Sequence, residues 1–464
     1  MSTADQGRPP ADRSPKERSF GLPAATALVV GSIIGTGVFA LPSALAPYGP
    51  IALVAFVLVT IGALALAVTF GRLAERSPGS GGPYVYAREA FGEFAGFLTA
   101  WSYWITAWAG NAAIAVAWVG YVEVFVNKGH HTWGSVAIAL VGLWVPAAVN
   151  LAGVRSMGVF QVVTTALKFL PLAFMATAGL LFVKSGNLGA FNASGTSALG
   201  AVSAAGAIAL FSYIGLETAS VAAGRVRDPR RNVPRATVYG TLACAVIYLL
   251  GTLAVFGTVP HARLVGSSAP FTDAVNNIAG GTWAGNLVAA AAIVSGLGAL
   301  NGWTLICAEM PMAAARDGLF PAAFARTRGE VPAVGIVSAT LLASALTVIS
   351  YTRFTQVFTE IVLLSVLTAV IPYLVSAAAQ LLRLVRSGRE EPDRRRFARD
   401  VTVTVLALAF SYWSIQGSGY QTVYYGLFTI LLGIPVYIWL KRNTGRSAPD
   451  PAAAARPPHS ARPA

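Results

Sequence analysis

Long apolar stretches separated by short polar segments make up the chain between residues 21 and 440. A helix needs about 20 consecutive apolar residues to cross the hydrocarbon core of a bilayer, and nearly all of these stretches reach that length. We therefore expect an all-α integral membrane fold with twelve transmembrane helices. The expected spans are 21–47, 51–74, 91–125, 133–153, 157–183, 198–223, 234–258, 285–314, 333–351, 357–382, 400–417 and 422–440.

Glycine interrupts the first and the sixth of these spans, in the sequences GSIIGTG at 31–37 and FSYIGLE at 211–217. Hydrocarbon offers no hydrogen-bonding partner, so a helix can be broken at membrane depth only where the freed backbone groups face protein or a cavity. One break in each half of a chain is the pattern of inverted-repeat secondary transporters, whose substrate site lies near the bilayer midplane. The sequence predicts such a site where the two breaks meet.

The composition agrees with a chain embedded in a lipid bilayer, with 55% hydrophobic and only 11% charged residues and a mean hydropathy of +0.63. Cys244 and Cys307 lie inside apolar spans, so we interpret them as small hydrophobic residues. The four histidines lie outside the spans. The spans therefore hold no His, Cys or paired-carboxylate constellation, and we expect no metal, no cofactor and no enzymatic activity.

The net charge of +14 is explained by where the basic residues lie. With the N-terminus inside, 28 of the 33 Lys and Arg residues fall in inside segments, four in outside loops, and Lys168 within a span. This bias predicts a cell membrane protein with both termini in the cytoplasm and no nucleic acid partner. No Gly-x-x-x-x-Gly-Lys-[Ser/Thr] loop occurs, so the work of transport would come from gradients and not from ATP bound to this chain.

The two ends of the chain differ from the apolar region between them. Residues 1–20 are polar and basic, and residues 443–464 are rich in Pro, Ala and Arg. We expect both to be disordered cytoplasmic tails that flank a single transporter domain at 21–442.

Five segments together resemble the amino acid/polyamine/organocation (APC) transporters. They are GSIIGTGVFALPSALAPY at 31–48, PGSGGPYVYAR at 78–88, FSYIGLETASVAAGRVRDPRRNVP at 211–234, NGWTL at 301–305 and AAARDGLFP at 313–321. Within that superfamily the chain is most similar to bacterial basic amino acid/polyamine antiporters such as the arginine/agmatine antiporter.

The resemblance implies a five-plus-five inverted repeat, with broken helices 1 and 6, alternating access and often a homodimer. The first repeat would cover about 21–183 and the second about 198–382, followed by two extra helices at about 400–440. The implied function is sodium-independent exchange of a cationic amino acid or its amine. Proton-coupled uptake of neutral L-amino acids is the alternative, and a channel or nutrient sensor is the alternative of another class.

In the first break, the exposed N–H groups of Thr36 and Gly37 would stand at the positive end of a half-helix, which suits a substrate carboxylate. The alternative is that these small residues only let helices pack closely. The resemblance adds Ser32 and Ile33 to Thr36 and Gly37 as amino-acid ligands.

In the second break, free carbonyls at Phe211, Ser212 and Ile214 could accept hydrogen bonds from a substrate ammonium. An ionisable group such as Glu217 costs about 2.5–3.5 kcal/mol at this depth, so it should be paired, protonated or functional. By resemblance Glu217 takes part in proton coupling or gating. A neutral glutamic acid that braces helices is the alternative.

Lys168 is the other charge within a span. Some superfamily members carry a lysine at the matching place, where its ammonium substitutes for sodium and contacts the first break. The resemblance therefore implies sodium-independent transport with a coupling role for Lys168. Snorkelling of the side chain to an interface is the alternative.

The resemblance also assigns aromatic and polar residues of other spans to the transport pathway. Tyr84, Tyr103 and Tyr373 match gating positions, and Trp303 and Phe211 match pocket positions. Thr106, Ala107, Asn111 and Ser365 match further substrate-binding positions. The chain departs from the arginine/agmatine pattern at Ser32, Ile114, Phe211 and Lys168, so strict arginine/agmatine specificity does not follow.

Overall fold

The computed structural model describes the backbone of residues 21–444 except 78–80, 154–156, 222, 224–225, 329–330, 355 and 388–393. The side chains of residues 36, 157–166, 387 and 443–444 are likewise not described. Within these limits the fold is helical, and its one β-type pairing is an isolated bridge between Arg328 and Val331. The tail predicted at 1–20, and the tail predicted at 443–464 from residue 445 on, lie outside the described residues. The last described helix runs to Thr444.

Eight helical segments of the described chain are long and apolar enough to cross a membrane. At 1.5 Å per residue, the shortest of them, with 20 residues, is about 30 Å long. They are α3 (Ile51–Arg76), α5 (Glu93–Val122), α6 (Thr132–Leu151), α10 (Pro229–Thr258), α13 (Trp283–Arg316), α14 (Ala333–Arg353), α15 (Val357–Ser387), and α17 (Tyr420–Leu431) with α18 (Gly433–Thr444).

The other four predicted spans are also helical, although each is interrupted, shorter or more charged. The first consists of α1 (Leu22–Ile33) and, after a break, η1 (Thr36–Phe39), α2 (Leu41–Leu45) and η2 (Ala46–Tyr48). The sixth consists of α8 (Ala198–Leu210), η5 (Phe211–Tyr213) and α9 (Thr218–Val221). The remaining two are α7 (Met157–Ala176) and α16 (Arg394–Gly417).

Several short helices lie between the spans and were not predicted, because a pattern search for spans of about 20 residues passes over them. They are α4 (Pro83–Phe91), η4 (Ser185–Asn187), α11 (His261–Leu264), α12 (Pro270–Ala279) and η7 (Ala322–Ala325). The short helix η3 (Ala178–Phe182) lies inside the span predicted at 157–183, after the end of α7.

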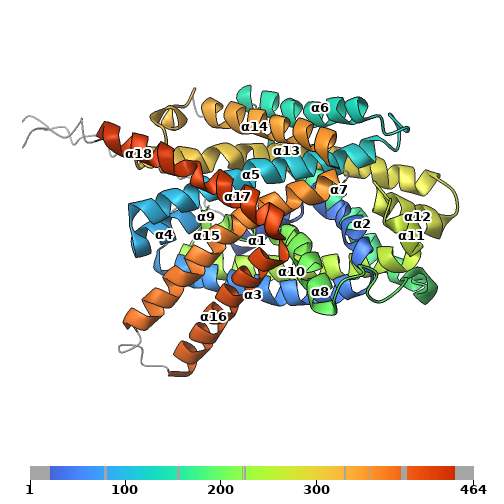
Figure 1. Cartoon of the computed structure of the whole chain (residues 1–464), viewed down its shortest axis with the longest axis horizontal. Helices are drawn as coiled ribbons and strands as arrows, with labels where there is room; N and C mark the ends of the chain where they lie inside the picture. The colour runs from blue at the N-terminus through green and yellow to red at the C-terminus, as the bar shows by residue number, and fades with distance from the viewer. Residues whose placement is uncertain are drawn as a thin grey trace, which may run out of the picture.

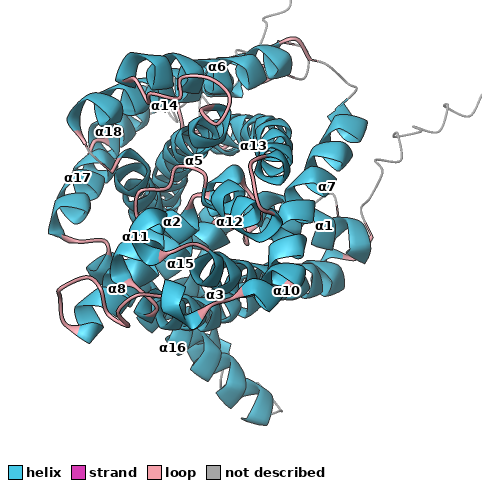
Figure 2. Ribbon diagram, turned by 90° about the vertical axis from the view of Figure 1, so that its right-hand side faces the viewer, coloured by secondary structure: helices cyan, strands magenta, loops and turns pink. Residues whose placement is uncertain are grey.

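The long helices run side by side across Figure 1, and Figure 2 shows several of them nearly end-on. Helix α5 lies in the middle of this bundle, and 94% of its most apolar window is buried. It packs against α15 and α13, while α3 and α10 pack against each other on another side.

Small residues allow the helices to approach each other closely: a Cβ atom at Gly62 on α3 would overlap the Phe410 ring on α16. Large apolar residues such as Trp133 and Tyr424 stay exposed on the outside, as a bilayer environment permits.

Candidate functional site

The first predicted break is present, and it is two residues long. Helix α1 ends at Ile33, Ile34 has a ψ of 85° and Gly35 is extended with a ψ of 173°. The chain becomes helical again at Thr36. Gly31 and Ser32 still belong to α1 and Thr36 begins η1, so only Ile34 and Gly35 of the GSIIGTG sequence are unwound. The N–H groups that open the second half-helix have no partner within it.

The second predicted break is present as well. Helix α8 ends at Leu210, a 3-10 turn follows at Phe211–Tyr213, and Ile214 is extended. Gly215 has a φ of +108°, a backbone conformation that a residue with a Cβ atom rarely adopts. The carbonyl of Phe211 accepts the Ile214 N–H at 3.3 Å, so this carbonyl has one acceptor position left for a ligand.

The two breaks lie directly against each other. A Cβ atom at Gly215 would be 2.9 Å from the carbonyl oxygen of Ser32, and one at Gly37 would be 2.4 Å from Cε1 of Phe211. Both distances are shorter than Cβ contacts allow. A side chain at Gly215 would meet backbone, so this close approach requires glycine, whereas one at Gly37 would require the Phe211 ring to move. Two segments that are 174 to 183 residues apart in the sequence (211 − 37 and 215 − 32) thereby come into contact.

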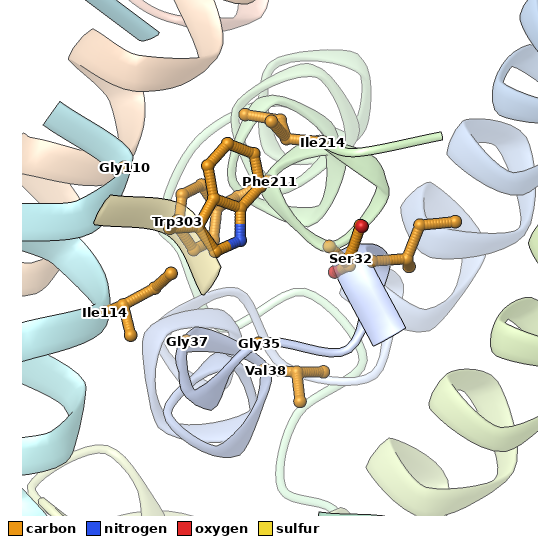
Figure 3. A pocket seen from close by; sticks show the side chains of 11 residues that line it. Ser32, Gly35, Gly37, Val38, Gly110, Ile114, Phe211, Ile214 and Trp303 are labelled. Carbon is orange, nitrogen blue, oxygen red and sulfur yellow. The ribbon is translucent and has the colours of Figure 1, made fainter. Parts of the chain in front are cut away.

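A small pocket lies between the breaks, with a volume of about 20 Å³, which is room for about one water molecule. Figure 3 shows Phe211 and Trp303 beside it, with Ser32 and Ile214 on the far side from Ile114. An amino acid could enter only after the surrounding side chains move. The pocket is lined by Ser32, Ile33, Gly35, Gly37, Val38, Gly110, Ile114, Phe211, Ser212, Ile214 and Trp303.

Side chains from two other helices hold the first break. The Lys168 ammonium on α7 donates to the carbonyl oxygen of Ile34 at 3.1 Å. The Tyr248 hydroxyl on α10 donates to the carbonyl oxygen of Ile33 at 3.0 Å. Lys168 is 1% exposed, so its side chain does not snorkel to an interface. These two donors satisfy carbonyls that the end of α1 leaves without helical partners.

The second break is held by its own carboxyl group. Glu217 is fully buried, and its carboxyl oxygens accept hydrogen bonds from Tyr103 on α5 at 2.7 Å and from Tyr373 on α15 at 2.8 Å. The Gly215 N–H, at 3.3 Å, is a third donor. Three predicted gating residues therefore form one cluster that ties the second break to α5 and α15.

Seven of the predicted substrate-binding residues line the pocket, namely Ser32, Ile33, Gly37, Phe211, Ser212, Ile214 and Trp303. The backbone of Thr36 opens η1, but its side chain is outside the described part of the chain.

The other predicted substrate-binding residues lie behind this lining. Ser365 Oγ donates to the carbonyl oxygen of Thr106 at 3.0 Å, and Thr106 Oγ1 donates to Thr368 Oγ1 at 3.0 Å, so this group joins α5 to α15. Ala107 is buried on α5. Asn111 Nδ2 donates to Thr304 Oγ1 at 3.2 Å. The hydroxyl of Ser365 would be 3.1 Å from a Cβ atom at Gly110, so it lies close to a glycine that lines the pocket.

Two buried polar atoms near the pocket have no hydrogen-bond partner among the described residues, namely Oδ1 of Asn111 and Oγ of Ser212. Buried polar atoms are seldom left unsatisfied, and a bound ligand or water is a common explanation.

Tyr84 is not part of this pocket. Its hydroxyl donates to Asp317, and Arg88 Nη1 donates to the same carboxylate at 3.1 Å. Tyr248 and Phe358 were not predicted as site residues. The ring of Phe358 meets that of Phe211 edge-on, with centroids 6.1 Å apart. The sequence feature that could have indicated Tyr248 is that a tyrosine, with its polar hydroxyl, lies within an apolar span.

A family model described as amino acid permease matches residues 20–434. Among similar proteins, the putative arginine/ornithine antiporter of Bacillus subtilis (strain 168) is 33% identical, over 90% of this chain and 96% of its own length. The putrescine transporter PotE of Haemophilus influenzae is 30% identical over 91% and 97%. The cadaverine/lysine antiporter of Escherichia coli (strain K12) is 29% identical over 86% and 90%.

Proposed function

Because the chain belongs to the amino acid permease family, we propose that it exchanges cationic amino acids, or the amines formed from them by decarboxylation, across the cell membrane without sodium. The observation that carries this proposal is the meeting of two unwound helix segments at one buried pocket. The names of the relatives, which include arginine/ornithine, putrescine and cadaverine/lysine transporters, support the substrate class.

The backbone of the two breaks supplies two poles for a zwitterion. The N–H groups at Thr36 and Gly37 stand at the start of a half-helix and would bind the substrate carboxylate. The carbonyl groups of Ser212 and Ile214 in the second break would accept hydrogen bonds from the α-ammonium. An amine without a carboxylate would bind only to the carbonyl groups of the second break.

The side chain of the substrate would lie among the aromatic lining residues. A cation over the face of Trp303 or Phe211 gains about 0.5–2 kcal/mol, which favours a cationic side chain. The unsatisfied oxygen atoms of Asn111 and Ser212 would supply acceptors once the lining opens.

Lys168 and Glu217 would serve the transport cycle without forming the pocket lining. The ammonium of Lys168 holds the first break where sodium-coupled transporters would hold an ion, which supports sodium independence. Protonation of Glu217 would change its hydrogen bonds to Tyr103 and Tyr373, so this cluster would gate movement of the second break.

We further propose the full architecture that the resemblance implies. The domain at 21–442 would have twelve spans, with repeats at 21–183 and 198–382 and two extra helices at 400–440. The excess of basic residues in alternate loops supports cytoplasmic termini. Two such chains would form a homodimer.

Proton-coupled uptake of neutral L-amino acids is a second candidate, because no charged side chain is among the residues that line the pocket between the described breaks. A neutral substrate would need no partner for its side chain beyond the apolar lining.

Counterflow into proteoliposomes tests both candidates. Vesicles containing the purified chain are loaded with one unlabelled amino acid or amine, and entry of labelled arginine, lysine or alanine is measured with and without a pH gradient. We expect internal arginine, lysine, ornithine or a diamine to accelerate arginine and lysine entry in the absence of sodium. Entry of alanine that depends on the pH gradient and not on internal substrate would favour the second candidate.

A further inference from the structure

The face of α15 that continues from Tyr373 carries buried polar side chains to which the exchange proposed above gives no role. Four polar residues follow one another there at spacings of three and four, so they share one face of the helix. They are Tyr373, Ser376, Gln380 and Arg383. At one end of this row the Tyr373 hydroxyl donates to Glu217. At the other end Arg383 pairs with Glu89, whose side chain is 43% exposed, so the row leads from the second break to the surface of the bundle.

The two residues in the middle of the row have unsatisfied oxygen atoms. Oγ of Ser376 and Oε1 of Gln380 have no hydrogen-bond partner in the part of the chain that the structure describes. The same holds there for the hydroxyl groups of Tyr86 on α4 and Ser220 on α9. Each of these four side chains is at most 1% exposed. Buried polar atoms usually have a protein or water partner, so the four oxygens indicate bound water.

Packing brings Tyr86 beside the row on α15. The Phe70 ring on α3 has its centroid 5.7 Å from that of Tyr373 and 6.5 Å from that of Tyr86, so both tyrosines border one phenyl ring. Glu89 follows Tyr86 by three residues, and its ion pair with Arg383 joins the same face of α4 to α15. Figure 1 shows these two helices beside each other.

Ser220 belongs to the same place, because the start of α4 is fixed to α9. The Gly81 N–H donates to the carbonyl oxygen of Val221 at 3.2 Å. The hydroxyl groups of Tyr86 and Ser220 are neighbours, yet they lack the geometry of a direct hydrogen bond. A water molecule between them would give each hydroxyl a partner.

We propose that water molecules bound by these four oxygens connect Glu217 with the cytoplasmic surface, and that Ser376 and Gln380 thereby position the route of its proton. A buried water makes about three hydrogen bonds, and α4, α9 and α15 supply the partners. A proton enters from water beside Glu89 and Arg383, passes along the hydrogen-bonded waters and hydroxyls, and binds the Glu217 carboxylate. Release follows the reverse path. This inference rests on the proton binding proposed for Glu217.

Titratable groups lie on either side of the two middle residues. They are Tyr103, Tyr373 and Cys307 around Glu217, and Tyr86, Glu89 and Arg383 toward the surface. Ser376 and Gln380 carry no charge, so neither of them holds the proton midway. They act by positioning water, and replacing them leaves the carboxyl group of Glu217 and its tyrosine partners in place.

Hydroxyl-radical labelling of the purified full-length chain, read by mass spectrometry, tests for the water. Radicals formed from a bound water oxidise the side chain beside it, so a buried tyrosine is labelled only where water lies next to it. Tyr86 is the probe. Tyr121 is the internal control, because it is equally buried and its hydroxyl donates to the carbonyl oxygen of Phe39 at 2.9 Å.

The test variant combines Ser376→Ala with Gln380→Met, which removes both oxygen atoms and leaves side chains of similar or smaller size. The control variant combines Thr404→Val with Ser411→Ala on α16. These two buried hydroxyls donate to carbonyl oxygens of their own helix, so removing them leaves the row on α15 unchanged.

We expect Tyr86 of wild type to be labelled about tenfold faster than Tyr121, because only Tyr86 has water beside it. The test variant should lose most of this difference, and the control variant should keep it. Equal labelling of the two tyrosines in wild type would overturn the proposal. So would equal labelling of Tyr86 in wild type and in the test variant.

Exchange by proteoliposomes in H₂O and in D₂O tests whether this water carries the proton. With the route interrupted, proton transfer limits the cycle, so the test variant should exchange severalfold more slowly and show a larger solvent isotope effect than wild type. A slower variant with the wild-type isotope effect would show a structural role only and overturn the route. If Glu217→Gln leaves the pH dependence of exchange unchanged, the coupling proposed for Glu217 fails and the route fails with it. Counterflow of cationic amino acids tests the exchange itself separately.

Discussion

The two helix breaks find hydrogen-bond partners for their buried polar groups in different ways. In the first, the carbonyls of Ile33 and Ile34 are satisfied by Tyr248 and Lys168, donors that come from other helices. In the second, Glu217 of the break itself accepts bonds from Tyr103 and Tyr373. Each solution meets the requirement that buried backbone and side-chain polar groups find partners in the membrane.

This difference in hydrogen-bonding partners indicates which of the two breaks can move. The first is anchored by donors on α7 and α10, so it should keep one shape. The second is held by a carboxyl group whose acceptor capacity changes when it binds a proton. We therefore expect the first break to be a fixed half of the site and the second to be the gated half.

The largest effect is expected where the two breaks touch. Gly215→Ala would place a Cβ atom 2.9 Å from the Ser32 carbonyl oxygen at a φ of +108°. The strain of such a conformation is about 1–3 kcal/mol before the clash is counted, so exchange in proteoliposomes should fall by about a hundredfold. Gly31→Ala is the matched control, because Gly31 is helical and has nothing within 4 Å of its Cβ position. Exchange by Gly215→Ala at half the wild-type rate would show that the breaks do not need this contact.

A smaller loss is expected when the anchor of the first break is removed. Lys168→Ala leaves the Ile34 carbonyl without its donor, and an unsatisfied buried acceptor costs about 1–3 kcal/mol. Exchange should therefore fall roughly tenfold to a hundredfold. The control is Lys184→Ala, at an exposed lysine in the segment between α7 and α8. Size-exclusion profiles separate a transport defect from misfolding, and unchanged uptake by a well-folded Lys168→Ala variant would remove the anchoring role.

Glu217→Gln tests the gated half. A glutamine has one acceptor oxygen where the carboxylate has two, so one of the tyrosine hydroxyls loses its partner at a cost of about 0.5–1.5 kcal/mol. Exchange at neutral pH should fall severalfold, and its variation between pH 5 and pH 8 should flatten.

Tyr103→Phe separates these two effects, since it removes one hydrogen bond and keeps the titratable group. This variant should be slower but should retain the pH dependence of wild type. A wild-type pH profile in Glu217→Gln would favour the alternative in which a neutral glutamic acid only braces the helices.

The smallest expected effect concerns selectivity. Phe211→Trp enlarges the aromatic face beside the pocket, and tryptophan is the strongest cation-π partner. Competition for labelled arginine entry should shift by a few-fold toward guanidinium-bearing compounds relative to lysine. Phe428→Trp, at an exposed position of α17, is the control. An unchanged competition profile would argue against contact between Phe211 and the substrate.

Much of the fold could be predicted because the bilayer restricts it. The apolar spans and both glycine breaks follow from the sequence, since length and backbone satisfaction leave few alternatives at membrane depth. Helices such as α4 and α12 could not be predicted from the same pattern, because they are too short to span.

The site could be predicted less completely from the sequence, because its geometry depends on how the helices rotate and pack. Tyr248 lies far along the chain from Ile33, and only the packing of α10 on α1 brings it there. Thr106, Ala107 and Ser365 were predicted to contact substrate, but the rotation of α5 and α15 sets them behind the pocket lining.

Protection of engineered thiols by substrate tests most directly whether both breaks form one site. In a Cys244→Ala/Cys307→Ala background, Ser32→Cys reports on the first break and Ser212→Cys on the second, and Ser185→Cys in η4 is the exposed control. We predict that a transported cationic amino acid slows modification at positions 32 and 212 with the same half-effective concentration, and leaves position 185 unaffected. Protection at only one of the two positions, or at neither, would contradict the account.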